Sequence, residues 1–170
     1  MLSRIREDAK TAPKTFGYKL YRGLLTLADE EEACTKPQWA YKFALFVSGA
    51  NIEKCQEAAC EDHYWAYNFA IDITGADIEK CQEAVCKDPE YAYWFARFIP
   101  GADIGKCQEA ACKDPHCAYI FARNIPGADI EQCQEAACKD PRWADKFARD
   151  VPVADIEGCR KACEGTEYAF

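Results

Sequence analysis

The chain has 170 residues, of which 12 are cysteine, 49% are hydrophobic and 29% are charged. This length predicts one domain, and an aromatic content of 13% argues against a disordered chain. The formal net charge of -8 argues against nucleic acid as the main partner, because phosphate binding needs a basic surface. No apolar run is long enough for a membrane span, and residues 1–8 lack the apolar stretch of a signal peptide. We therefore expect a soluble, acidic, cysteine-rich protein that has neither nucleic acid nor a membrane as its partner.

Residues 1–36 precede a regular repeat and keep only Cys34 of its cysteine pattern. We expect them to form an N-terminal helical cap, since the terminal repeats of a stack are atypical. From residue 37 to residue 166 the chain consists of five units of 26 residues without insertion or deletion. These units begin at Pro37, His63, Pro89, Pro115 and Pro141. Residues 167–170 resemble the start of a sixth unit and form a truncated tail.

Each unit predicts two short helices joined by a turn. An Asp–Pro pair such as Asp88–Pro89 is a helix start signal, and apolar residues then recur at helical spacing. Pro100–Gly101 ends this first helix, and Asp103 is the expected N-cap of the second. Helices of about ten residues are too short to be stable alone and depend on stacking. The predicted fold class is therefore all-α, an α-solenoid of five two-helix repeats.

Small and large apolar residues recur at the same slots of every unit. Alanine recurs beside one phenylalanine per unit, and the alternation of sizes lets successive layers interdigitate. The recurring phenylalanines are Phe43, Phe69, Phe95, Phe121 and Phe147. A column of tyrosines is expected to pack between units and comprises Tyr41, Tyr67, Tyr93 and Tyr119.

Ten of the twelve cysteines lie in the five second helices, two in each helix, and the first four pairs are five residues apart. Five residues correspond to about 140° of helix rotation, so the two thiols of one helix face opposite neighbours. A constant separation of 21 residues then links each unit to the next. The predicted disulfides are Cys34–Cys55, Cys60–Cys81, Cys86–Cys107, Cys112–Cys133 and Cys138–Cys159. Cys117 and Cys163 are left over in this pairing.

Two alternatives to disulfides stay open at this point. Free cysteine is commonly a small buried apolar residue, so the thiols could be reduced core positions. Metal binding is the other alternative, although structural zinc sites favour closely spaced ligands on a knuckle or turn. The predicted pairing also requires staggered or tilted helices, since paired cysteines differ by about 7.5 Å of helical rise. The compartment would be extracellular or periplasmic if the disulfides form, and cytoplasmic otherwise.

The outward slots of the first helix vary strongly between units, whereas the core slots barely change. They carry large apolar groups beside arginine, which is the composition of protein interaction hot spots. We therefore predict that a partner protein binds Tyr64, Asn68, Ile71, Glu90, Trp94, Arg97, His116, Ile120 and Arg123. A mixed solvated face with scattered apolar residues is the alternative and is normal for soluble proteins.

The sequence contains no recognisable catalytic constellation, and we expect neither enzymatic activity, nor a cofactor, nor a metal site. The two histidines, His63 and His116, leave little room for imidazole-based catalysis or metal ligation. Cys117 follows His116 directly, but neighbouring residues on a helix point about 100° apart. This direction argues against a thiolate–imidazole pair.

The unit motif resembles short helical tandem repeats of bacterial and phage proteins whose function is largely unassigned. The resemblance is carried by Tyr-Ala-Tyr-x-Phe-Ala-Arg at residues 91–97 and Gly-Ala-Asp-Ile-x-Lys-Cys-Gln-Glu-Ala at residues 101–110, and it covers residues 37–166. It implies an α-solenoid and supplies no catalytic residues. In those repeats the two cysteine slots are usually aliphatic, so the resemblance implies a specialised variant here. A 26-residue period is shorter than that of tetratricopeptide, ankyrin and HEAT units.

Our first hypothesis is a non-enzymatic repeat scaffold for protein–protein interaction, stapled by inter-repeat disulfides and monomeric or weakly oligomeric. The second is a phage- or host-encoded inhibitor that occludes a defence enzyme or a nucleic-acid-binding protein with its acidic body. The third, from another class, is a thiol-rich metal or redox buffer.

Overall fold

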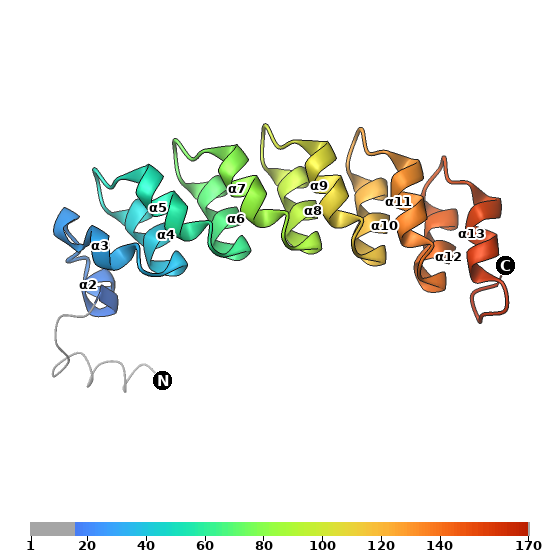
Figure 1. Ribbon diagram of the computed structural model, residues 1–170, viewed down its shortest axis with the longest axis horizontal. Helices are drawn as coiled ribbons and strands as arrows, with labels where there is room; N and C mark the ends of the chain where they lie inside the picture. Colours follow the sequence, from blue (N-terminus) through green and yellow to red (C-terminus); the bar gives the residue numbers. More distant parts are fainter. Residues whose placement is uncertain (1–15, 170) are drawn as a thin grey trace.

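The computed structural model describes residues 16–169, and it contains helices and no strands within that range. Successive helical hairpins stand side by side and form an elongated rod whose two ends lie far apart (Figure 1). The predicted all-α solenoid is therefore confirmed. Residues 1–15 of the predicted N-terminal cap lie outside the described residues, as does Phe170 at the end of the tail.

The helices follow one another in strict alternation after the cap. The cap contains α2 (Phe16–Arg22), the short 3-10 helix η1 (Leu27–Asp29) and α3 (Glu30–Ala33). The first helices of the five repeats are α4 (Pro37–Phe46), α6 (His63–Asp72), α8 (Pro89–Phe98), α10 (Pro115–Asn124) and α12 (Pro141–Asp150). The second helices are α5 (Ile52–Ala59), α7 (Ile78–Val85), α9 (Ile104–Ala111), α11 (Ile130–Ala137) and α13 (Ile156–Cys163).

The helix boundaries follow from the predicted capping residues. The carboxylate of Asp88 accepts hydrogen bonds from the amides of Glu90 and Tyr91 at the start of α8. Asp103 caps α9 by accepting from the Lys106 amide. The turn between these two helices requires glycine, since Gly101 has a φ of +85° and a side chain there would be strained. Two first turns among the repeats have no side-chain cap: Lys36 precedes Pro37 at the start of α4, and Asp155 makes no capping bond at the start of α13.

The core runs the length of the rod. The recurring phenylalanines are fully buried, and so are alanines such as Ala92 in the slots beside them. The cap supplies Phe16 as a further fully buried phenylalanine, which stacks on Trp39 of the first repeat at a ring-centroid distance of 4.9 Å. Each first helix packs against the second helix of its own repeat and the first helix of the next. This nearest-neighbour packing is what stabilises helices of eight to ten residues.

Four glutamines, three of them buried and Gln134 half-buried, provide a second connection between repeats, which we did not predict from the sequence. The Gln82 amide nitrogen donates to the Asp103 carbonyl at 2.7 Å, and its oxygen accepts from the Asp103 amide at 2.9 Å. The same two-bond contact joins Gln56 to Asp77, Gln108 to Asp129 and Gln134 to Asp155. Each glutamine thus fixes the N-terminus of the next second helix.

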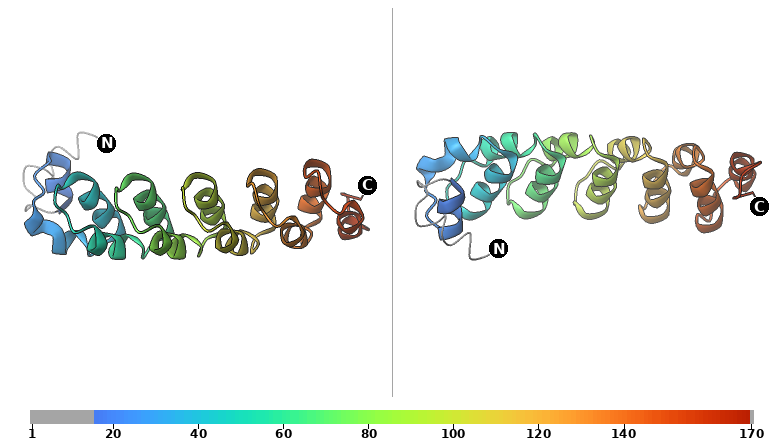
Figure 2. Two further views of the ribbon diagram at one scale, coloured as in Figure 1. Left: turned by 90° about the horizontal axis from the view of Figure 1, so that it is seen from above. Right: turned by 90° about the horizontal axis from the view of Figure 1, so that it is seen from below.

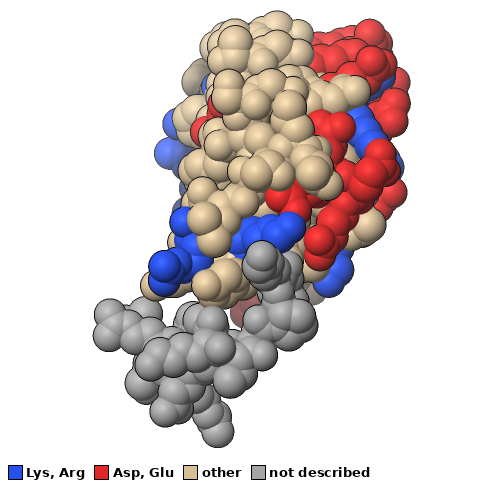
Figure 3. Space-filling view, turned by 90° about the vertical axis from the view of Figure 1, so that its left-hand side faces the viewer, with Lys and Arg blue, Asp and Glu red and all other residues tan. Residues whose placement is uncertain are grey.

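The two rows of helices give the rod two different long faces, seen from above and below in Figure 2. Acidic side chains gather on one flank, with lysines between them (Figure 3). Ion pairs between successive second helices, such as Lys80–Glu53 at 3.5 Å and Lys106–Glu79 at 3.0 Å, explain this interleaving. None of the described helices has both the length and the apolar character needed to cross a bilayer.

Candidate functional site

Four of the nine predicted partner-binding residues line one groove between α6 and α8. The groove has a volume of about 260 Å³. It is lined by Tyr64, Tyr67, Asn68, Glu90, Tyr91 and Trp94, a set we call the aromatic groove. Four of these six side chains are aromatic, and the groove opens to solvent along the row of first helices. Neighbouring repeats therefore combine to form a site that neither repeat has alone.

Contacts between rings hold the walls of the aromatic groove in place. Tyr91 lies edge-on to Tyr64 at 6.1 Å and to Tyr67 at 5.8 Å between ring centroids. Burial raises the pKa of Tyr67 and of Tyr91, so both phenols are neutral at physiological pH. Rigid aromatic walls lose little conformational entropy when a ligand binds, which favours a higher affinity for the same buried area.

The C-terminal end of α8 extends the aromatic groove with an exposed cluster. Trp94 is half-buried and stacks on Phe98, with centroids 5.6 Å apart and the planes tilted by 11°. Phe98 is 53% exposed, and the Arg97 guanidinium lies 5.5 Å from its ring centroid. Sequence reasoning missed Phe98. The sequence did contain a signal for it, because three of the other four repeats carry a polar Asp or Asn at the position equivalent to Phe98.

The other predicted partner residues do not line the groove. Ile71 is exposed near the end of α6. His116 stacks on Trp143 with centroids 4.3 Å apart, and Ile120 is half-buried. Arg123 donates to the Tyr119 hydroxyl at 3.0 Å, so its guanidinium is partly used within α10. The residues of α10 thus form a separate surface beside the groove.

The predicted cysteine pairs lie side by side along the rows of second helices. The Sγ atoms are 4.0 Å apart in Cys60–Cys81, 3.8 Å in Cys112–Cys133 and 3.6 Å in Cys138–Cys159. The remaining two pairs, Cys34–Cys55 and Cys86–Cys107, also interact through their thiols. These distances are near, but longer than, the roughly 2.05 Å of a disulfide, and all twelve cysteines are reduced in the structure.

The helices are offset in the manner that the pairing requires. The outer cysteine of each pair ends one second helix, as Cys60 does at the C-cap of α5. The inner cysteine lies in the first turn of the next helix, as Cys81 does in α7. The C-terminal end of one second helix thus meets the N-terminal end of the next, and the expected difference in helical rise disappears.

The two thiols of a pair differ in access. The inner sulfurs belong to fully buried residues, whereas the outer ones are half-buried. Three outer cysteines line grooves between successive second helices: Cys60, Cys86 and Cys138. Reagents can therefore reach a pair from its outer thiol.

The contact between the two thiols of a pair also shifts their pKa values in opposite directions. In the pair Cys60–Cys81 the contact with Cys81 lowers the pKa of Cys60, and Lys87 acts in the same direction. The same contact, together with burial, raises the pKa of Cys81. Cys86 and Cys112 have lowered pKa values for the same main reason, whereas burial raises the pKa of Cys138. The outer thiols of the three central pairs are thus the better nucleophiles.

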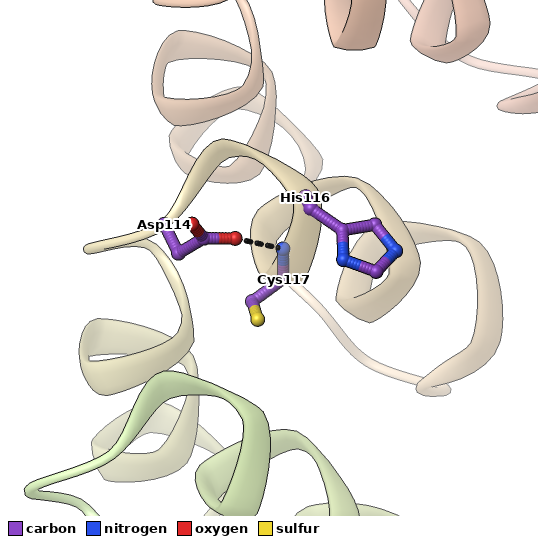
Figure 4. Close-up of side chains that lie close together, drawn as sticks. All are labelled: Asp114, His116 and Cys117. Carbon is purple, nitrogen blue, oxygen red and sulfur yellow. Dashed lines mark hydrogen bonds between the residues drawn. The ribbon is translucent and has the colours of Figure 1, made fainter.

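The two cysteines outside the pairing have different surroundings. The Cys163 thiol lies 3.3 Å from the Pro141 carbonyl oxygen, to which it donates. Cys117 lies on the first turn of α10 beside Asp114 and His116 (Figure 4). The carboxylate of Asp114 accepts a hydrogen bond from the Cys117 amide at 2.9 Å.

Comparison of the chain with protein families, with characterised proteins and with solved structures gives no match. The resemblance to bacterial and phage tandem repeats accordingly stays a prediction. The function is inferred from the aromatic groove and the cysteine pairs.

Proposed function

We propose that this protein is a non-enzymatic repeat scaffold that binds a partner protein through the aromatic groove. The observation that carries the proposal is the convergence of Tyr64, Asn68, Glu90 and Trp94 on one groove. These residues come from outward slots that vary between repeats, so packing of the repeat does not require them. Aromatic side chains with a nearby arginine are enriched at the energetic centres of protein interfaces.

The charges at the two ends of α8 indicate what the partner presents. Glu90 stands at its N-terminal end and Arg97 near its C-terminal end, with the aromatic walls between them. A complementary segment carries an apolar or aromatic side chain for the groove and a basic group facing Glu90. Complementary charges of this kind contribute to specificity and to the rate of association more than to affinity.

The test compares the partners of the purified wild type and two variants by quantitative mass spectrometry of proteins retained from a native-source extract. Trp94→Ala removes the groove wall, and Lys42→Ala is the matched control at the equivalent slot of the first repeat. A true partner is retained by the wild type and by the control, and its Kd is then measured with purified protein. Truncation of a hot-spot residue costs about 2 kcal/mol or more, so we expect Trp94→Ala to weaken binding roughly 30-fold. Equal Kd values for all three proteins would contradict the proposal.

The proposal also includes five disulfide staples between successive repeats. The sulfur atoms of the three measured pairs are 3.6–4.0 Å apart, so small rotations of the side chains bring them to bonding distance. The outer thiolate attacks a low-mass or protein disulfide, and the inner thiol then displaces the second leaving thiolate. Each staple thus removes two protons and two electrons from the pair and reduces one external disulfide to two thiols.

The staples act on the shape of the binding surface. Residues of the aromatic groove come from the second and third repeats, and Cys86–Cys107 links those same two repeats on the opposite row of helices. A covalent bond there limits the relative motion of α6 and α8, and the pre-organised groove loses less entropy on binding.

A further inference from the structure

The fourth repeat differs from the other four at two neighbouring positions. Cys117 occupies a slot that is aromatic elsewhere, filled by Trp39, Trp65, Tyr91 and Trp143. His116 occupies the slot before it, filled in the other repeats by Gln38, Tyr64, Glu90 and Arg142. Both changes introduce a side chain that can ligate a transition metal, and they lie two and three residues after the capping residue Asp114. The loss of a packed aromatic ring at one slot thus coincides with the gain of two ligand atoms.

The structure brings three possible ligand atoms together at the N-terminus of α10. One carboxylate oxygen of Asp114, one imidazole nitrogen of His116 and Sγ of Cys117 all lie within 4.8 Å of one another (Figure 4). Helical geometry directs the adjacent side chains of His116 and Cys117 apart, whereas Asp114 approaches from outside the helix. The capping geometry turns the Asp114 carboxylate back over the first turn, where it meets the Cys117 amide.

The three side chains are held to different degrees. The bond from the Cys117 amide holds the Asp114 carboxylate, and Cys117 itself is only 5% exposed. The His116 ring stacks on Trp143 at the surface, and its exposed side chain can leave that stack and rotate toward Cys117. The group therefore has two fixed members and one adjustable member.

The charges around Cys117 favour a cation. The Asp114 carboxylate lies beside the thiol, and Glu90 and Asp88 at the N-terminal end of α8 add negative charge around it. These three carboxylates favour a divalent cation next to the ligand atoms.

We propose that Asp114, His116 and Cys117 bind one divalent transition-metal ion of the Zn²⁺ class. The donor set of one sulfur, one nitrogen and one oxygen suits Zn²⁺, whereas Ca²⁺ and Mg²⁺ prefer oxygen ligands alone. Three protein ligands leave the fourth position to water. On binding, the thiol releases its proton and the sulfur forms a bond to the ion, so that one proton leaves for each ion bound.

The geometry requires a modest closure. Zinc–ligand distances of about 2.0–2.3 Å in a tetrahedron place the ligand atoms roughly 3.5 Å apart. The three atoms therefore approach one another by about 1 Å, which rotation of the exposed His116 side chain can supply.

The experiment titrates purified reduced protein with Zn²⁺ by calorimetry and with Co²⁺ by absorption spectroscopy. Four proteins are compared in the same thiol state: wild type, His116→Ala, Cys117→Ser and the control His63→Ala. His63 also follows an aspartate and contacts an aromatic ring, Tyr91, with centroids 4.8 Å apart and the planes tilted by 55°, but no cysteine follows it. Any metal bound by the ten paired thiols is common to all four proteins and cancels in the comparison.

We expect Cys117→Ser to bind one Co²⁺ fewer than the wild type and to lose part of the sulfur-to-cobalt charge-transfer band. We expect His116→Ala to weaken the same site at least tenfold, and His63→Ala to match the wild type. Titration curves of His116→Ala that coincide with those of the wild type would overturn the proposal. His116 is exposed, so this variant remains informative even if Cys117→Ser unfolds.

Discussion

At the scale of single residues, buried glutamine determines how each repeat meets the next. Gln82 is 3% exposed and uses both ends of its amide on the backbone of Asp103. An unpaired buried polar group costs about 1–3 kcal/mol, so the two bonds must form together. The recurrence of glutamine at four equivalent slots was visible in the sequence. Its role was not, because recurrence alone does not distinguish an exposed polar residue from a buried bidentate one.

Replacement of Gln82 by alanine should lower the free energy of unfolding by about 2–3 kcal/mol. The substitution removes two hydrogen bonds and leaves the amide and carbonyl of Asp103 without their partner. Chemical denaturation followed by circular dichroism measures the loss. Glu83→Ala, at the exposed neighbouring position, is the matched control and should change stability by no more than about 0.5 kcal/mol. Equal losses in the two variants would show that the glutamine contact does not join the repeats.

At the scale of helices, sequence patterns predicted the boundaries well because local chemistry decides them. The capping aspartates, the glycine turns and the apolar spacing all act within a few residues, and the structure follows them at α8 and α9. The aromatic groove was predictable in part. Comparison of repeats identified its variable residues, whereas their grouping into one site depends on how α6 and α8 pack.

The packing between helices depends on alanines that leave room for the next layer. Ala92 is fully buried in α8, and leucine at this position should lower the free energy of unfolding by roughly 1–3 kcal/mol through overpacking. The loss is measured by thermal and chemical denaturation. Glu109→Leu, exposed on α9, controls for the added apolar volume and is expected to be near neutral. An Ala92→Leu variant as stable as the wild type would contradict the close packing of the layers.

At the scale of the whole molecule, the repeats form one rod because the main helix contacts within residues 16–169 join helices of the same or of neighbouring repeats. Each junction must therefore be stable by itself. The main contacts at the junctions include buried phenylalanine and alanine, the glutamine bonds and the cysteine pairs, with ion pairs and ring contacts at the surface. A staple that closes a loop of about 20 residues contributes roughly 3 kcal/mol in the chain-entropy model. Five staples would therefore add more to stability than the surface ion pairs.

The cysteine pairing links the sequence period, the geometry of the second helices and the rigidity of the aromatic groove. The 21-residue separation could be recognised in the sequence because the repeat has no insertions. The offset of the helices that brings Cys60 to Cys81 could not be recognised in the sequence, since it depends on the tilt between neighbouring repeats. The position of Asp114 beside Cys117 was also not predicted, because it depends on the capping hydrogen bond that the Asp114 carboxylate accepts from the Cys117 amide.

Disulfide mapping of protein isolated from its native source, with free thiols alkylated at lysis, tests the central claim most directly. Cleavage after glutamate separates the two cysteines of each of the four helices α5, α7, α9 and α11, and trypsin separates Cys112 from Cys117 and Cys159 from Cys163. We predict five cross-linked peptide pairs, each joining cysteines 21 residues apart, with Cys117 and Cys163 alkylated. Twelve alkylated cysteines, or pairs at other separations, would contradict a rod stapled from repeat to repeat.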